Sequence, residues 1–285
     1  MTNTLMSPLS LSRESLDRFC THITGKLGIK MSPAKLPMLQ SRLQRRLREL
    51  QIPTLEAYQT FLFDSPDGEA EDVHFIDAVT TNKTDFFREP VHFDYLTDNV
   101  LPELDSDPDG VRPWQFKLWC AGCSSGEEPY TLAMVLSEYA AQRRNFEFSL
   151  LATDISSRVL DHAVRGIYDA DRIEPVAAEL RAKYLLHSKD PAQSQVRIVP
   201  ELRQRITFRR LNFMDSDYLV KERFDVIFFR NVLIYFDKPT QEAVINKLCR
   251  NLIPGGYLFV GHSESLAGLK IPVTCVNTAV YRKSL

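Results

Sequence analysis

The sequence lacks the features of a membrane or secreted protein. No apolar run in its 285 residues approaches the ~18 residues that a membrane-spanning helix needs. The first seven residues contain neither a basic segment nor a sustained apolar one, so no secretory signal is visible. The five cysteines are odd in number and irregularly spaced, which is not the pattern of a disulfide framework. We therefore expect a reduced, cytoplasmic protein.

An excess of one charge is also missing from the chain as a whole. The 35 Lys and Arg residues nearly balance 37 Asp and Glu residues, and the net charge of -2 argues against a nucleic-acid coat or a polybasic membrane binder. The charge is nevertheless uneven, because residues 1–50 hold nine basic and three acidic residues, a net +6, and the rest of the chain carries -8. This asymmetry predicts a separate N-terminal unit with its own partner.

The basic N-terminal region has a helical pattern. Five leucines at spacings of three or four residues form one apolar stripe (Leu36, Leu39, Leu43, Leu47 and Leu50). Four arginines spread over the remaining surface of this helix and, taken alone, are most simply a solvated face (Arg42, Arg45, Arg46 and Arg48). Thr54 is a candidate N-cap for the next helix, residues 64–68 have turn chemistry, and a further helix is expected over 69–79. Residues 1–79 are therefore predicted to be all-helical.

Beyond the turn-forming residues 105–110, apolar strands alternate with helices. Strands are predicted over 115–120, 146–152, 224–229 and 257–260, and helices over 127–143, 156–164 and 239–252. This alternation is typical of an α/β domain with a doubly wound, Rossmann-like parallel sheet. One stretch departs from it, since residues 196–199 and 205–208 are predicted to pair as a small antiparallel β insertion within residues 180–210. We therefore divide the chain into an α-helical domain (1–79), a linker (80–110) and a sheet domain (111–285).

Ligands of open parallel sheets bind beyond the carboxyl ends of the strands. The first such end, residues 119–130, combines small residues with two carboxylates, Glu127 and Glu128, that open the next helix. It lacks the Gly-x-Gly-x-x-Gly spacing of dinucleotide sites, and its carboxylates would repel a pyrophosphate but not a cationic group. Helix capping explains the two glutamates equally well.

Two further strand ends carry polar residues. Asp154 follows the second strand, where an acidic residue commonly binds ribose hydroxyls, although it is equally suited to capping the next helix. Arg230 and Asn231 close an apolar strand, and Tyr235 follows one helical turn later. Such residues at the end of a fully buried strand are uncommon without a ligand.

Cys120 and Cys123 admit another interpretation, because Trp-Cys-x-x-Cys before a helix resembles the active site of thioredoxin-like oxidoreductases. Glu127 and Glu128 argue against it, since nearby carboxylates raise the pKa of a thiol. A structural zinc site would need a second pair of Cys or His ligands at a suitable spacing, which the sequence lacks. No metal site is therefore expected.

Five motifs follow one another along the chain: Thr80–Glu89 (TTNKTDFFRE), Ser125–Tyr130 (SGEEPY), Arg165–Tyr168 (RGIY), Arg230–Phe236 (RNVLIYF) and Gly261–Glu264 (GHSE). In their order and in their amino acids, these motifs resemble those of the CheR family of chemoreceptor glutamate methyltransferases, and the likeness runs from about residue 36 to the C-terminus. The resemblance implies S-adenosylmethionine as the cofactor and S-adenosylhomocysteine as a product. It also implies transfer of the methyl group to glutamate side chains of chemotaxis receptors, which gives glutamate methyl esters.

The resemblance assigns residues as well. Nine are expected to line the cofactor site, the first three of them from the linker (Asn82, Thr84, Arg88, Glu128, Asp154, Asn212, Phe213, Arg230 and Asn231). Asp154 would meet the ribose and Glu128 the amino end of the methionine moiety. Asn212 and Phe213 would lie beside the adenine. The family often has Leu at the position of Phe213, a difference that changes packing rather than chemistry.

Arg88 and Tyr235 are the expected catalytic residues, and the arginines of the N-terminal helix are expected to bind the cytoplasmic methylation region of the receptor (Arg42, Arg45, Arg46 and Arg48). The acceptor carboxylate, with a reference pKa of about 4.3, is already ionised at neutral pH, so no general base is required. His262 is accordingly interpreted as structural. We expect a monomer that binds no nucleic acid and does not insert into a membrane. A cofactor-binding sensor or adaptor without turnover is the alternative, which the presence of Arg88 and Tyr235 disfavours.

Overall fold

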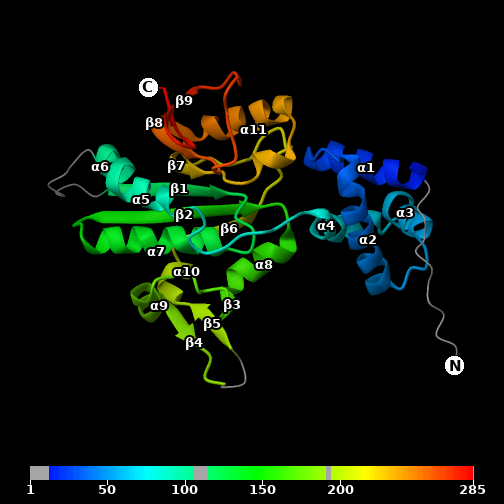
Figure 1. Cartoon of the computed structure of the whole chain (residues 1–285), viewed down its shortest axis with the longest axis horizontal. Coiled ribbons are helices and arrows are strands. Elements are labelled where there is room, and N and C mark those ends of the chain that lie inside the picture. The colour runs from blue at the N-terminus through cyan, green and yellow to red at the C-terminus, as the bar shows by residue number, and fades with distance from the viewer. Residues whose placement is uncertain (1–12, 106–113, 191–193, 285) are drawn as a thin grey trace. The chain divides into compact units, whose positions relative to one another are not determined.

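The computed structural model describes residues 13–105, 114–190 and 194–284. The chain divides into two compact units, Met1–Thr81 and Asn82–Leu285 (Figure 1). Residues 82–105, which we expected as part of a linker, belong to the second unit and are largely helical. No helix in the described part of the chain is both long and apolar enough to span a bilayer.

The first unit is built from helices, as the sequence predicts. They are α1 (Arg13–Leu27), the short 3-10 turn η1 (Pro33–Lys35), α2 (Leu36–Leu50), α3 (Leu55–Asp64) and α4 (Gly68–Val79). The predicted stripe of α2 faces the core through Leu39, Leu43 and Leu47, which are all buried. The predicted cap of α3 is confirmed, because Oγ1 of Thr54 accepts a hydrogen bond from the backbone N–H of Ala57 at 3.1 Å.

The second unit contains a mainly parallel sheet of seven strands within the described residues. Its spatial order is β6-β2-β1-β7-β8-β10-β9. The strands are β1 (Trp114–Ala121), β2 (Phe146–Asp154), β6 (Ile206–Arg210), β7 (Phe224–Phe228), β8 (Leu252–Phe259), β9 (Val273–Asn277) and β10 (Val280–Lys283). The chain winds outward from β1 through β2 to β6 and returns to β7 on the other side of β1, so the strand order reverses between β1 and β7. The predicted doubly wound fold is confirmed, with an antiparallel hairpin, β9 and β10, that the sequence analysis did not anticipate.

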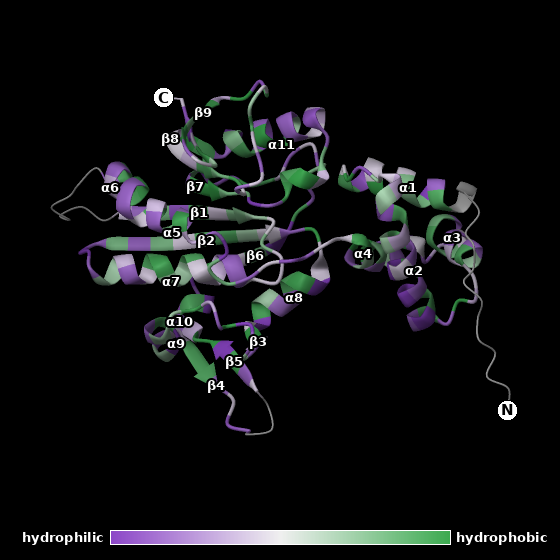
Figure 2. Ribbon diagram, viewed as in Figure 1, coloured by the Kyte–Doolittle hydropathy of each residue, from purple (hydrophilic) through white to green (hydrophobic). Residues whose placement is uncertain are grey.

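Both faces of this sheet are covered. Alternate residues of β1 enter two different cores, with Phe116 and Leu118 in one and Trp119 in the other. The first core is closed by α7 (Glu127–Ala141) and by the helical segment α5 (Val91–Tyr95), η2 (Leu96–Val100) and α6 (Leu101–Leu104). The second is closed by α11 (Lys238–Arg250), which Figure 2 shows in mixed purple and green, the pattern of an amphipathic helix.

The β insertion differs from its predicted form. A three-stranded antiparallel sheet has the order β3 (Ile167–Asp169), β5 (Gln195–Ile198) and β4 (Leu185–His187), with α9 (Ala178–Tyr184) before β4. The predicted pairing of 196–199 with 205–208 is wrong, because β6 instead lies parallel to β2 at the edge of the main sheet. The physical reason is the short helix α10 (Pro200–Arg203), which separates the two strands and lets β6 bury Ile206 in the main core.

Candidate functional site

The loop after β1, residues 122–126, holds the ends of β1 and β2 together. Gly122 and Gly126 have φ angles of 84° and 101°, a backbone conformation that favours glycine. A Cβ atom on Gly126 would lie 2.7 Å from the Tyr168 hydroxyl, so a larger residue does not fit. The backbone N–H groups of Gly122 and Cys123 donate to the Thr153 carbonyl at 2.7 and 2.9 Å. The small residues noted in the sequence therefore bring this loop against the end of β2.

Asp154 is the last residue of β2 and is buried beneath that loop, with 8% of its surface exposed. Its Oδ2 accepts from the backbone N–H of Ser124 at 2.9 Å, and its Oδ1 accepts from that of Ser156 at 3.0 Å. The capping alternative is wrong, because the N-cap of α8 (Ser157–Arg165) is Ser156, whose hydroxyl accepts from the N–H of Val159. Asp154 is thus a buried carboxylate at the carboxyl end of the sheet.

Arg230 follows β7 and is fully buried between two carboxylates. Its Nη2 lies 3.1 Å from Oε2 of Glu89 and also donates to the backbone carbonyl of Arg88. Its Nη1 lies 3.1 Å from Oε2 of Glu128, but among the described residues neither Nη1 nor Nε has a hydrogen-bond partner, so the contact with Glu128 is electrostatic. A buried guanidinium whose Nε and Nη1 donors make no hydrogen bond within the described part of the protein is suited to bind a ligand that carries a carboxylate.

Glu89 connects this arginine to the neighbouring strand ends, a role that the sequence analysis missed. Its carboxylate accepts from Nδ2 of Asn231 at 3.3 Å and from the backbone N–H of His262 at 3.2 Å. Burial by itself would raise the pKa of Glu89, but Arg230, Asn231 and the His262 N–H outweigh it and hold this pKa below its ordinary value. The only signal in the sequence was its position beside Arg88 in the first motif.

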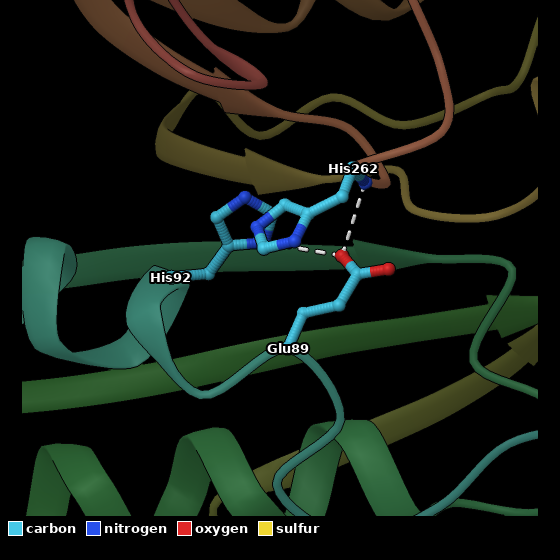
Figure 3. A group of neighbouring side chains, drawn as sticks. All are labelled: Glu89, His92 and His262. Carbon is cyan, nitrogen blue, oxygen red and sulfur yellow. Dashed lines mark hydrogen bonds and ion pairs between the residues drawn. The ribbon is translucent and has the colours of Figure 1, made fainter.

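Two histidines flank Glu89 (Figure 3). His92 in α5 is 1% exposed, and its Nδ1 lies 3.6 Å from Oε2 of Glu89, which is too far for a hydrogen bond. The rings of His92 and His262 meet edge to face with their centroids 4.5 Å apart. Burial, Arg230 and His262 lower the pKa of His92 to about 4, so its ring is neutral at pH 7 and is a weak base.

The turn after β7 is fixed by Glu264. This buried carboxylate accepts from the backbone N–H groups of Asn231 at 2.8 Å and Gly261 at 2.6 Å. Asn231 has a φ angle of 60°, and a Cβ atom on Gly261 would lie 2.3 Å from its Nδ2. The short helix η3 (Leu233–Tyr235) follows, and Tyr235 is half-buried at its end. The last two sequence motifs therefore form one turn.

The predicted residues of the linker motif are joined to the same edge mainly through their backbone. The carbonyl of Asn82 accepts a hydrogen bond from Oγ of Ser124 at 3.1 Å. Ser124 also donates its backbone N–H to Asp154. Thr84 is buried. Arg88 is half-buried, and its guanidinium donates to the carbonyl of Lys83 at 3.2 Å.

The predicted adenine-side residues follow β6. The backbone N–H of Leu211 donates to the carbonyl of Asp154 at 2.9 Å, which sets Asn212 beside the end of β2. Oδ1 of Asn212 accepts from the N–H of Met214 at 3.0 Å. Phe213 is buried, with its ring centroid 4.9 Å from that of Phe229. Phe213 thus provides an apolar surface two residues after Leu211, which is hydrogen-bonded to Asp154.

Arg172 is a second residue that sequence analysis missed. It follows β3 and donates to Oδ1 of Asp85 at 3.0 Å, to the carbonyl of Thr84 at 2.6 Å and to Oε1 of Glu127 at 3.0 Å. The side chain of Glu127 is 2% exposed, so Arg172 neutralises a buried carboxylate while it holds Thr84 in place. Its distance of almost ninety residues from the linker motif hid this contact from any local pattern.

Arg172→Ala is expected to weaken the binding of S-adenosylhomocysteine by roughly tenfold and to lower stability by about 1–2 kcal/mol, since Arg172 is partly exposed and its ion pair is screened. Isothermal calorimetry and urea unfolding measure the two effects. Arg172→Lys is the matched variant, because it keeps a charge for Glu127 but not the planar fork that also reaches Thr84. Equal affinity in the wild-type protein and Arg172→Ala would contradict a positioning role.

The two cysteines of the alternative redox motif are both buried. Burial, followed by Glu128, raises the pKa of the Cys120 thiol well above its usual value, and burial with Asp154 does the same for Cys123. Sγ of Cys120 donates to Oε1 of Glu128 at 3.1 Å. Protonated, buried thiols are poor nucleophiles, so the pair does not fit a thioredoxin-like site.

The four arginines of α2 fall into two groups. Arg42 donates to the carbonyls of Val79 and Thr80 and to Oγ1 of Thr81, and thereby closes the end of α4. Arg46 pairs with the buried Glu71 at 2.6 Å. Arg45 and Arg48 are exposed, with Arg45 also contacting Glu49 on the same helix. Only the second group presents its charge mainly to solvent.

A doubly wound sheet with a buried acid after its second strand suits a ligand with ribose hydroxyls, and its first loop is unsuited to a pyrophosphate. This arrangement fits the Rossmann-like methyltransferase class that the sequence resemblance implies. The comparisons agree: residues 82–282 match the CheR methyltransferase SAM binding domain, and residues 14–80 match the CheR methyltransferase all-alpha domain. The chain belongs to the CheR methyltransferase family, which confirms the resemblance seen in the sequence, and its cofactor is S-adenosylmethionine.

Similar proteins cover nearly the whole chain. It is 38% identical over 277 residues to the chemotaxis protein methyltransferase of Borreliella burgdorferi, a match that covers 97% of this chain and 96% of that protein. It is 36% identical over 270 residues to chemotaxis protein methyltransferase 2 of Pseudomonas aeruginosa, covering 95% and 93% of the two chains. The chemotaxis protein methyltransferase of Salmonella typhimurium is 34% identical over 276 residues, with 97% and 92% covered.

Proposed function

We propose that this protein methylates glutamate side chains of chemotaxis receptors in the cytoplasm and forms glutamate methyl esters. Its family membership and its relatives, which are named chemotaxis protein methyltransferases, support this function. The observation that carries the proposal is the buried guanidinium of Arg230, with unfilled donors, next to the half-buried Arg88. The half-buried Arg88 is suited to attract the acceptor carboxylate, while Arg230 serves the carboxylate of the cofactor. An acceptor that is ionised before it reacts needs no general base.

The residues at the strand ends fit the cofactor. S-adenosylmethionine carries ribose hydroxyls, an adenine ring and a methionine end with an ammonium and a carboxylate. The buried Asp154 suits the hydroxyls and Glu128 the ammonium, while the unfilled donors of Arg230 suit the carboxylate. Asn212 and the buried Phe213 suit the adenine, and Asn82, Thr84, Arg88 and Asn231 complete the proposed set.

The chemistry asks little of the protein beyond orientation. The bound cofactor supplies an activated methyl group. Arg88 and Tyr235 are proposed to hold the acceptor carboxylate in line and to replace the water around it. Because the carboxylate is already ionised, no side chain has to remove a proton, which is consistent with the low basicity of His92.

The test is incubation with S-adenosylmethionine labelled on its methyl group and the cytoplasmic methylation region of a receptor. Methyl esters hydrolyse in base, so label released as methanol after alkaline treatment reports glutamate modification. Arg88→Ala is expected to slow this release by roughly tenfold to a hundredfold, because an orienting charge-assisted bond contributes about 1.5–3 kcal/mol. Arg144→Ala, which removes an exposed arginine far along the chain, is the control.

The rival function is a sensor or adaptor that binds the cofactor without turnover. Cofactor binding by calorimetry without any base-labile label, across the receptors of the host, would support the rival and contradict the proposed reaction. An unchanged rate and unchanged cofactor affinity in Arg88→Ala would show instead that the linker motif is only structural.

We propose that Arg45 and Arg48 on α2 contact the acidic methylation region of the receptor. Of the four arginines that the sequence indicated for receptor binding, Arg42 and Arg46 instead make contacts within the helical unit. Arg45 has 79% of its side chain exposed, so its charge is available for long-range attraction. Reversing the charge of Arg46 would leave the buried Glu71 without its ion-pair partner, so a loss of binding could not be told from a loss of folding.

Charge reversal by Arg45→Glu with Arg48→Glu is expected to slow receptor methylation roughly tenfold, with unchanged affinity for S-adenosylmethionine. The wild-type rate should also fall with added salt, because steering between exposed charges is screened beyond about 8–10 Å. Arg144→Glu makes the same kind of charge change in the other unit and should leave the rate alone. A salt-independent rate that survives the double reversal would favour a merely solvated face.

A further inference from the structure

Three side chains with metal-ligand atoms meet beside the strand ends, and the proposed reaction uses none of them as ligands (Figure 3). Glu89 and His92 come from the start of the second unit, and His262 comes from the turn after β8. One ligand atom from each lies within 4.8 Å of the others. No metal site was expected from the sequence, because local spacing cannot show that His262 meets Glu89 from 173 positions away.

His92 is the unusual member of this group. It is 1% exposed, yet neither Nδ1 nor Nε2 makes a hydrogen bond of good geometry to another described residue, although the backbone of Thr278 lies nearby. Buried polar atoms are nearly always paired, because leaving them unpaired costs free energy. The His92 ring packs edge to face against Phe259, with the ring centroids 5.5 Å apart. This packing holds the His92 ring beside Glu89 and His262. An imidazole nitrogen held in this way is an available ligand.

The other two residues give the site access and charge. His262 is exposed, so an ion can enter from solvent and this ring can rotate. Rotation is needed, since ligand atoms around a tetrahedral zinc ion lie only about 3.3 Å apart. Arg230 lies 3.1 Å from Glu89 and opposes a cation, but it keeps Glu128 as a second partner at 3.1 Å when Glu89 turns toward the ion.

We propose that Glu89, His92 and His262 bind a divalent transition-metal ion of the zinc class. Two imidazoles and one carboxylate are ligands that zinc accepts, with the fourth position left to water. The site does not depend on methyl transfer to glutamate, so it can be tested without a receptor.

The test is calorimetric titration of the chelator-treated full chain with zinc chloride, in a Cys275→Ser background that removes the exposed thiol. One equivalent is expected to bind. His262→Ala should weaken binding by more than the roughly 10–100-fold that loss of an outer-shell partner costs, because it removes a direct ligand. Since His262 is exposed, this variant should fold normally. His187→Ala, which removes an exposed histidine of β4, is the matched control and should bind as the parent does.

Substitution of cobalt for zinc gives a second measurement. The visible absorption of the cobalt complex should show coordination by imidazole in the parent and should be lost in both His262→Ala and Glu89→Gln. Absence of a one-to-one site, or equal affinity in the parent and His262→Ala, would overturn the proposal. Loss of binding in His187→Ala alone would overturn it as well, since the ion would then lie elsewhere.

Discussion

Asp154→Ala is expected to weaken S-adenosylmethionine binding by about 1.5–3 kcal/mol, roughly tenfold to a hundredfold in Kd, because an ionised acceptor for two ribose hydroxyls is lost. The structure adds a second contribution. The carboxylate also accepts the N–H groups of Ser124 and Ser156, so its removal loosens the loop after β1 that approaches the ligand. Calorimetry with S-adenosylmethionine and with S-adenosylhomocysteine measures the effect.

Two variants separate these contributions. Asp154→Asn keeps one oxygen for a backbone donor and should lose less affinity than Asp154→Ala. Asp161→Ala removes an exposed carboxylate from α8 and should not change affinity, which controls for net charge. If Asp154→Ala binds the cofactor as tightly as the wild-type protein, the ribose assignment is wrong and Asp154 serves only the loop.

The fold could be predicted because its signals are local. Buried strands such as β1 and β7 are short apolar runs between turn residues, and their alternation with helices leaves few topologies. The strand-end residues Asp154 and Arg230 could be predicted for the same reason, since the end of a buried strand is an unusual place for a charge. What the pattern could not show was the partner of each charge.

Partners depend on contacts between distant parts of the chain. Glu89 meets Asn231 and His262, and Arg172 meets Thr84, across separations that periodicity cannot detect. The predicted pairing of β6 was wrong for a similar reason, because the sequence of a five-residue strand does not show which sheet edge it joins. Arg46 shows the limit for charges, since its position on the polar side of α2 gave no hint of the buried Glu71.

The largest loss of stability is expected from Arg230→Met, which removes the buried guanidinium and keeps much of its volume. Glu89 and Glu128 would then remain without their shared cation, and breaking a buried pair in this way costs about 3–5 kcal/mol. Urea unfolding measures the loss. Arg250→Met, at the exposed end of α11, is the control and should change stability by less than about 0.5 kcal/mol.

The pH dependence of this variant identifies the cause. In the wild-type protein the pKa of Glu89 is held below its ordinary value, so its contribution to stability is present above the pKa of the unfolded chain and is lost as the pH falls through the folded value. Without Arg230, burial dominates and raises the pKa, so the folded state then binds the extra proton. Arg230→Met should therefore be less destabilised at pH 5 than at pH 8, and adding Glu89→Gln should recover part of the loss at pH 8. A loss that is equal at both pH values and is not relieved by Glu89→Gln would assign the effect to packing against Phe93 and Phe228, whose rings lie 5.5 and 5.9 Å from the guanidinium carbon.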